Sequence, residues 1–110
     1  MKSQVERRDP TTTDSDKYQV LFENERVRVL EYRDKPGDIT SPHDHPGSVM
    51  YTLSSFRRKL VFGDRTAVVD KSAGEVSWLE PQRHQGENVG TTDTHVLVVE
   101  LREPGGGQDG

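Results

Sequence analysis

The chain has 110 residues, the size of a single domain, and a net charge of −4 at neutral pH. This acidic balance argues against general nucleic-acid binding, which requires a surface that neutralises phosphates. The sequence contains no cysteine, which excludes disulfides, thiolate metal sites and cysteine nucleophiles. We see no apolar signal segment, and the longest strongly apolar run, 96–99, is too short to span a bilayer. We therefore expect a cytoplasmic protein with no membrane contact.

Both ends of the chain are poor in large apolar residues. Residues 1–17 hold one valine besides Met1, and residues 103–110 are mainly glycine and polar residues. Because such segments bury too little apolar area to offset their ordering entropy, we expect a disordered tail at each end. The remaining domain, 18–102, has a small core, and domains of this size often gain stability by pairing. We therefore expect a homodimer.

Short apolar segments separated by turn residues predict an all-β, antiparallel domain of the sandwich or barrel type. No stretch is long enough to predict an amphipathic helix. Gly63 and Asp64 form a two-residue hairpin signal, which predicts antiparallel pairing of 58–62 with 65–70. The expected strands cover 18–22, 26–33, 48–53, 58–62, 65–70, 74–79, 83–88 and 94–101.

The segment 41–47, "SPHDHPG", carries the first candidate site. Residues i and i+2 of a strand share one face, so His43 and His45 can direct two imidazoles to a common point while Asp44 faces away. The two flanking prolines restrict the backbone, which suits a preorganised site. The same pattern also fits a surface loop with two solvated histidines.

A third histidine, His84 in "PQRHQGEN", could complete a three-imidazole site with the first two. Neutral imidazole suits zinc, iron, nickel and copper. Three neutral ligands would leave coordination positions open, as in a binding or catalytic site and unlike a closed structural one.

Two segments resemble the sequence motifs of the cupins, small jelly-roll β-barrels of the RmlC-like type. Residues 37–45, "GDITSPHDH", match the first half of the first motif: a glycine, five residues and His-x-His. Residues 74–88, "GEVSWLEPQRHQGEN", match the glycine, the proline displaced by one residue, the histidine and the asparagine of the second motif. The resemblance spans about residues 20–101. It implies one cupin domain over 18–102, an antiparallel double-stranded β-helix.

The resemblance also implies that His43, His45 and His84 bind a divalent metal ion, with iron, zinc, nickel and manganese all open. The glutamate of the first motif is missing, because Val49 and Met50 stand where it is expected. Some cupin dioxygenases work with three histidines alone, but a neutral triad attracts a metal less strongly than one with a carboxylate.

Four further residues are candidates for lining a pocket: Met50, Tyr51, Trp78 and His95. Core filling is the favoured interpretation of the first three, and a histidine at a strand end is more often structural or exposed. The basic run 57–59 could bind an anionic substrate, or could protect an exposed strand from association.

These observations predict a small metal-dependent enzyme acting on a small molecule, with a carboxylate as one option. Its chemistry would be dioxygenase-like with iron, or isomerase- or lyase-like with another divalent ion. The alternative is a non-catalytic cupin that binds or senses a small ligand, which the lost glutamate and the lack of an obvious acid–base residue favour. A third hypothesis is a degenerate cupin that has lost its activity and is retained because it assembles with a partner. The fold cannot choose among them, because it carries many chemistries.

Overall fold

The computed structural model describes residues 7–102. Residues 1–6, and the C-terminal tail expected over 103–110, lie outside the described residues. Within 7–102 the chain forms one short helix and nine strands. They are α1 (Pro10–Thr13), β1 (Tyr18–Glu23), β2 (Val27–Asp34), β3 (His43–His45), β4 (Ser48–Ser54), β5 (Phe56–Phe62), β6 (Arg65–Lys71), β7 (Val76–Leu79), β8 (Gln82–Asn88) and β9 (Thr94–Leu101).

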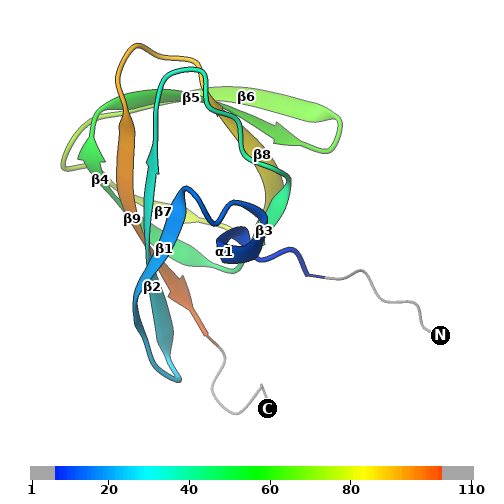
Figure 1. The fold of residues 1–110 in the computed structure, drawn as a ribbon, viewed down its shortest axis with the longest axis vertical. Helices are drawn as coiled ribbons and strands as arrows, with labels where there is room; N and C mark the ends of the chain where they lie inside the picture. The colour runs from blue at the N-terminus through cyan, green and yellow to red at the C-terminus, as the bar shows by residue number, and fades with distance from the viewer. Residues whose placement is uncertain (1–6, 103–110) are drawn as a thin grey trace.

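The strands form two antiparallel sheets, in the orders β1-β2-β9-β4-β7 and β3-β8-β5-β6 (Figure 1). The predicted all-β antiparallel organisation is therefore confirmed. The hairpin prediction is confirmed too: β5 pairs with β6, Phe62 faces Arg65, and Gly63 takes the positive φ of 60° that the tight turn requires.

Strict alternation decides which side chains of β9 face the core. Thr94, Val96, Val98 and Glu100 are buried, whereas the residues between them are only partly buried. The core cluster contains Tyr18, Leu30, Tyr32, Met50, Phe56, Val96 and Val98. Several of these side chains also line a cavity to which both sheets contribute. Across residues 7–102, no helix is long and apolar enough to cross a membrane.

Residues 7–17 differ from the disorder expected of them. The segment runs beside β3 (Figure 1), where the backbone N–H of Arg8 donates to the Asp44 carboxylate at 2.7 Å. Further along, the Asp14 carboxylate is buried and accepts a hydrogen bond from the Ser41 N–H at 2.9 Å. The prediction counted only apolar area, whereas polar contacts to the rest of the fold hold this segment in place.

Candidate metal centre

Three histidines meet because two short strands pair in one particular register. β3 runs antiparallel to β8 with His43 directly opposite His84, and His45 lies two residues along on the same face. Between 0 and 8% of each histidine is exposed, and the imidazole centroids lie 4.8–5.0 Å from one another. One nitrogen from each ring falls within 4.8 Å of the other two, so the three residues could hold a metal ion.

The other nitrogen of each ring, Nδ1, faces an oxygen acceptor. The contacts are His43 to the Ser41 carbonyl at 2.8 Å and to Asp14 at 3.3 Å, His45 to Glu100 at 3.4 Å, and His84 to the Gln82 Oε1 at 2.5 Å. An acceptor at Nδ1 fixes the proton there and leaves the lone pair on Nε2. This donor chemistry fits a divalent transition metal held by three Nε2 atoms.

Burial also keeps two of the imidazoles in the ligand form. Desolvation lowers the pKa of His43 to about 4 and that of His84 to about 2, and repulsion from the neighbouring imidazoles adds to the effect. Both rings are therefore neutral near pH 7, as metal ligation requires.

A buried carboxylate supports His45 from behind. Glu100 is 2% exposed, and it accepts a hydrogen bond from the Arg28 Nε at 2.9 Å. Burial opposes its ionisation, but hydrogen bonds from His45 and Arg28 outweigh that cost and lower the pKa of Glu100. Sequence reasoning missed this residue, although its place on the inward-facing register of "THVLVVEL" was a usable signal. It also missed Asp14, which lies in the segment predicted to be disordered.

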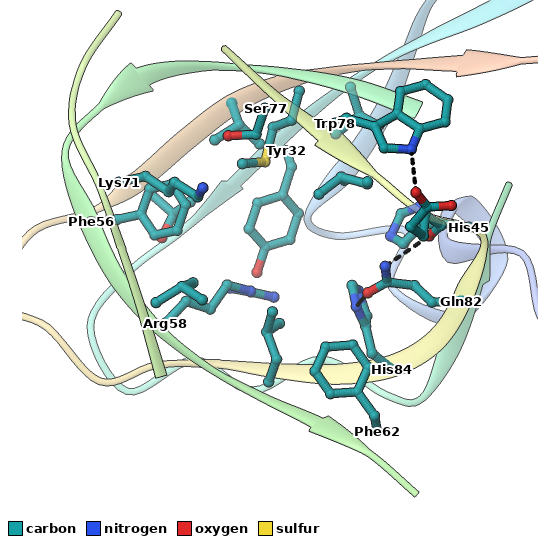
Figure 2. A pocket seen from close by; sticks show the side chains of 18 of the residues that line it. Tyr32, His45, Phe56, Arg58, Phe62, Lys71, Ser77, Trp78, Gln82 and His84 are labelled. Carbon is teal, nitrogen blue, oxygen red and sulfur yellow. Dashed lines mark hydrogen bonds between the residues drawn. The ribbon is translucent and has the colours of Figure 1, made fainter. Parts of the chain in front are cut away.

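The histidine cluster lies at one end of a cavity of about 320 Å³ (Figure 2). Apolar side chains form most of its wall: Met50, Phe56, Leu60, Phe62, Leu79, Val96 and Val98. Two polar groups stand out among them. Arg58 extends into the cavity in Figure 2, and the buried Ser77 Oγ has no hydrogen-bond partner among the described residues.

Strand alternation separates the members of the basic run 57–59. Arg57 faces outward and pairs with Asp70 of the neighbouring strand β6 at 2.8 Å, on the solvent-facing side of β5, which lies between β8 and β6. Arg58 faces inward and is 8% exposed; its Nη1 donates to Asp34 at 2.8 Å, and its guanidinium lies 4.8 Å from the centre of the Tyr32 ring. Only Arg58 of this run lines the cavity.

The four predicted pocket residues divide into two pairs. Met50 and Trp78 line the cavity, whereas Tyr51 and His95 do not. Tyr51 follows Met50 on β4 and therefore points to the opposite face, where it is 41% exposed. His95 lies on the outward-facing register of β9 and contacts Glu31 through Nε2 at 2.7 Å. The placement of these two differs from the prediction because each strand turns alternate residues outward.

No family model matches the chain, and no curated protein sequence does. Solved structures do. A cupin domain from Bordetella pertussis Tohama I is 24% identical with a TM-score of 0.72, covering 77% of this chain and 91% of that one. An RmlC-like cupin from Methanocaldococcus jannaschii is 13% identical with a TM-score of 0.64, covering 77% and 78%. A predicted oxalate decarboxylase from Thermotoga maritima is 20% identical with a TM-score of 0.54, covering 76% and 78%.

The resemblance drawn from the two sequence motifs is thus confirmed at the level of the fold. The Bordetella and Methanocaldococcus proteins are both described as cupins, and the second as having a double-stranded β-helix. With its two antiparallel sheets around a histidine-bearing cavity, this chain has the cupin fold.

Proposed function

We propose that this chain is a metal-dependent enzyme that acts on a small anionic molecule, with His43, His45 and His84 as ligands of a divalent ion. The observation that carries the proposal is the orientation of the three buried rings. Each Nδ1 faces an acceptor, and one nitrogen of each ring lies within 4.8 Å of the others. Histidines that serve only to fill a core do not need three such partners and a shared centre.

The cavity beside the histidines indicates the kind of substrate. Its volume falls at the lower end of the range for small-molecule sites, and its wall is mainly apolar. Two cationic side chains, Arg58 and Lys71, line this wall, although Arg58 already forms an ion pair with the buried Asp34, and the unpaired Ser77 hydroxyl adds a hydrogen-bonding group. These features suit a small molecule with a carboxylate and an apolar part.

An ion held by three imidazoles, when bound, would supply Lewis acidity, or oxygen activation if it is iron. The chain's own residues would do the rest. Lys71, with Arg58 beside it, would hold the anionic group of the substrate at the wall, and Phe56, Phe62 and Met50 would keep water from the apolar part. The choice between dioxygenase-like and isomerase- or lyase-like chemistry depends on which ion is resident.

A second candidate function is non-catalytic binding of a small ligand. It is favoured by the scarcity of carboxylates available for proton transfer in the cavity. Asp14 and Glu100 face the Nδ1 atoms of the histidines, and neither lines the cavity. Glu80 does line it, but its carboxylate accepts a hydrogen bond from the Trp78 Nε1 at 2.9 Å.

Metal content, measured by plasma mass spectrometry, tests the proposal. The protein is purified without a histidine tag, beside a His43→Ala/His45→Ala variant. We expect near-stoichiometric metal in the parent and none in the variant; no metal in either, even after incubation with each ion, would refute metal-dependent function. If metal is present, small carboxylates are then screened with and without chelation. Turnover that chelation abolishes supports the enzyme, and ligand binding that survives chelation supports the non-catalytic alternative.

We also propose that two copies of the chain pair, as the small core predicts. Exposed apolar side chains on β1, Leu21 at 49% and Phe22 at 54%, offer surface for such pairing. Sedimentation that finds only monomer at micromolar concentration would rule the dimer out.

A further inference from the structure

A tyrosine hydroxyl lies beside two of the three histidines. Tyr18 is the first residue of β1 and is 8% exposed. Its Oη is 3.5 Å from the Nε2 of His43 and 3.4 Å from the Nε2 of His45. The hydroxyl therefore faces the same two nitrogens that are free to bind a metal.

These distances fit shared ligation of an ion better than hydrogen bonding. Hydrogen bonds between oxygen and nitrogen are usually about 2.7–3.2 Å between heavy atoms, so separations of 3.4 and 3.5 Å are long for one. Two ligands bound to one tetrahedral ion at about 2.0–2.1 Å stand about 3.3–3.4 Å apart. The Tyr18 Oη lies close to that separation from both nitrogens at once.

We propose that Tyr18 is a fourth metal ligand, binding through its phenolate oxygen beside His43, His45 and His84. On binding, the ion takes the place of the phenol proton, which leaves to water. This inference rests on the metal site proposed above. It also accounts for the lost glutamate: Met50, at one of the two positions expected for that residue, offers no carboxylate, and a tyrosinate restores one negative charge to the ligand set.

Contacts outside the two sequence motifs fix the position of Tyr18. Its ring packs 4.6 Å from the ring of Tyr32, which is its partner across the β1–β2 pair. Its backbone N–H donates to the Asp14 carbonyl at 3.1 Å, and the Asp14 carboxylate contacts the Nδ1 of His43 at 3.3 Å. The segment before β1 thus positions the tyrosine and one of its histidine neighbours together.

Ferric iron is the probe for this proposal, because a tyrosinate bound to Fe(III) gives an intense visible charge-transfer absorption and imidazoles alone do not. Metal-free parent, Tyr18→Phe and Tyr32→Phe proteins are loaded with Fe(III), and absorption and iron content are measured on the same samples. Tyr32→Phe is the matched control, since its hydroxyl donates to Asp34 at 2.5 Å and contacts no histidine nitrogen. We expect the band in the parent and in Tyr32→Phe, and its loss in Tyr18→Phe.

Zinc affinity gives a second readout, by competition with a chromophoric chelator. Tyr18→Phe should weaken zinc binding by at least about tenfold, and Tyr32→Phe should leave it nearly unchanged. Should Tyr18→Phe fail to fold, a Tyr32→Phe/Tyr51→Phe variant leaves Tyr18 as the only one of the three tyrosines in the chain, so a retained band identifies it.

The outcomes separate this inference from the proposed function. Stoichiometric iron without a visible band in the parent would overturn the tyrosinate ligand and leave the three-histidine site standing. A band that persists in Tyr18→Phe, or is lost from the Tyr32→Phe/Tyr51→Phe protein, would overturn it too. A parent that binds neither iron nor zinc would overturn both.

Discussion

Acidification should destabilise the metal-free protein well before its carboxylates are protonated. His43 and His84 have folded-state pKa values of about 4 and about 2, below the ordinary value of 6.5 that applies to the unfolded chain. Between pH 6.5 and about 4, the unfolded state therefore binds more protons than the folded state. The free energy of unfolding must then fall as the pH falls through this window.

The size of the loss follows from the same pKa values. One unit below the unfolded pKa, at about pH 5.5, each histidine costs about 1.4 kcal/mol, so the two together cost about 3 kcal/mol relative to about pH 7.5. That is a large part of the 5–15 kcal/mol that holds a typical domain together. Carboxylates contribute little in this range, because unfolded aspartate and glutamate are still almost fully ionised at about pH 5.5.

Urea unfolding of the chelator-treated protein at several pH values measures this loss. A His84→Leu variant is the matched comparison: it removes one of the two titrating groups, so its loss should be about half as large, about 1.4 kcal/mol. A metal-free parent whose stability changes by less than about 1 kcal/mol between the two pH values would refute the argument that burial holds these imidazoles neutral.

Two further predictions concern buried carboxylates. Asp14→Ala should weaken zinc binding by about 10- to 100-fold in a chelator competition, because the carboxylate orients His43; Asp16→Ala, on the exposed side of the same segment, should not. A wild-type affinity for Asp14→Ala would contradict that role. Arg58→Met should lower the free energy of unfolding by about 3 kcal/mol in urea melts, because it leaves the Asp34 charge buried without its cation. Adding Asp34→Asn should recover much of this loss, and purely additive effects of the two changes would contradict the pairing.

The predictions from sequence succeeded where strand alternation or local spacing carries the information. The His-x-His pattern placed His43 and His45 on one strand face, and the glycine–aspartate turn gave the β5–β6 hairpin. Both are consequences of backbone geometry over a few residues. His84 was proposed as a third imidazole from its residue type, but only the family motif gave a reason to expect its segment beside His43, as the pairing of β3 with β8 places it.

The two pocket candidates that lie away from the cavity share a physical reason. Tyr51 and His95 were candidates because of the strands they lie on, but a register one residue away turns a side chain to the other face. Their neighbours Met50 and Val96 reach the cavity instead. The sequence of the basic run 57–59 also did not indicate that Arg58 is the residue that faces inward. That depends on which face of β5 packs against the opposite sheet.

The largest gap concerns the supporting groups that lie outside the two sequence motifs, beyond the Ser41 carbonyl and the Gln82 amide that lie within them. Asp14 and Tyr18 come from the N-terminal segment, and Glu100 comes from the last strand, so each reaches the site by a contact that spans more than 20 residues of chain. The first motif lacks its glutamate, yet three oxygen-bearing groups from outside the motifs surround the same imidazoles. The motifs therefore encode the three nitrogen donors and two of the acceptors that orient them, the Ser41 carbonyl and Gln82. The carboxylates that face His43 and His45 come from chain segments whose composition alone gave no reason to connect them with a metal.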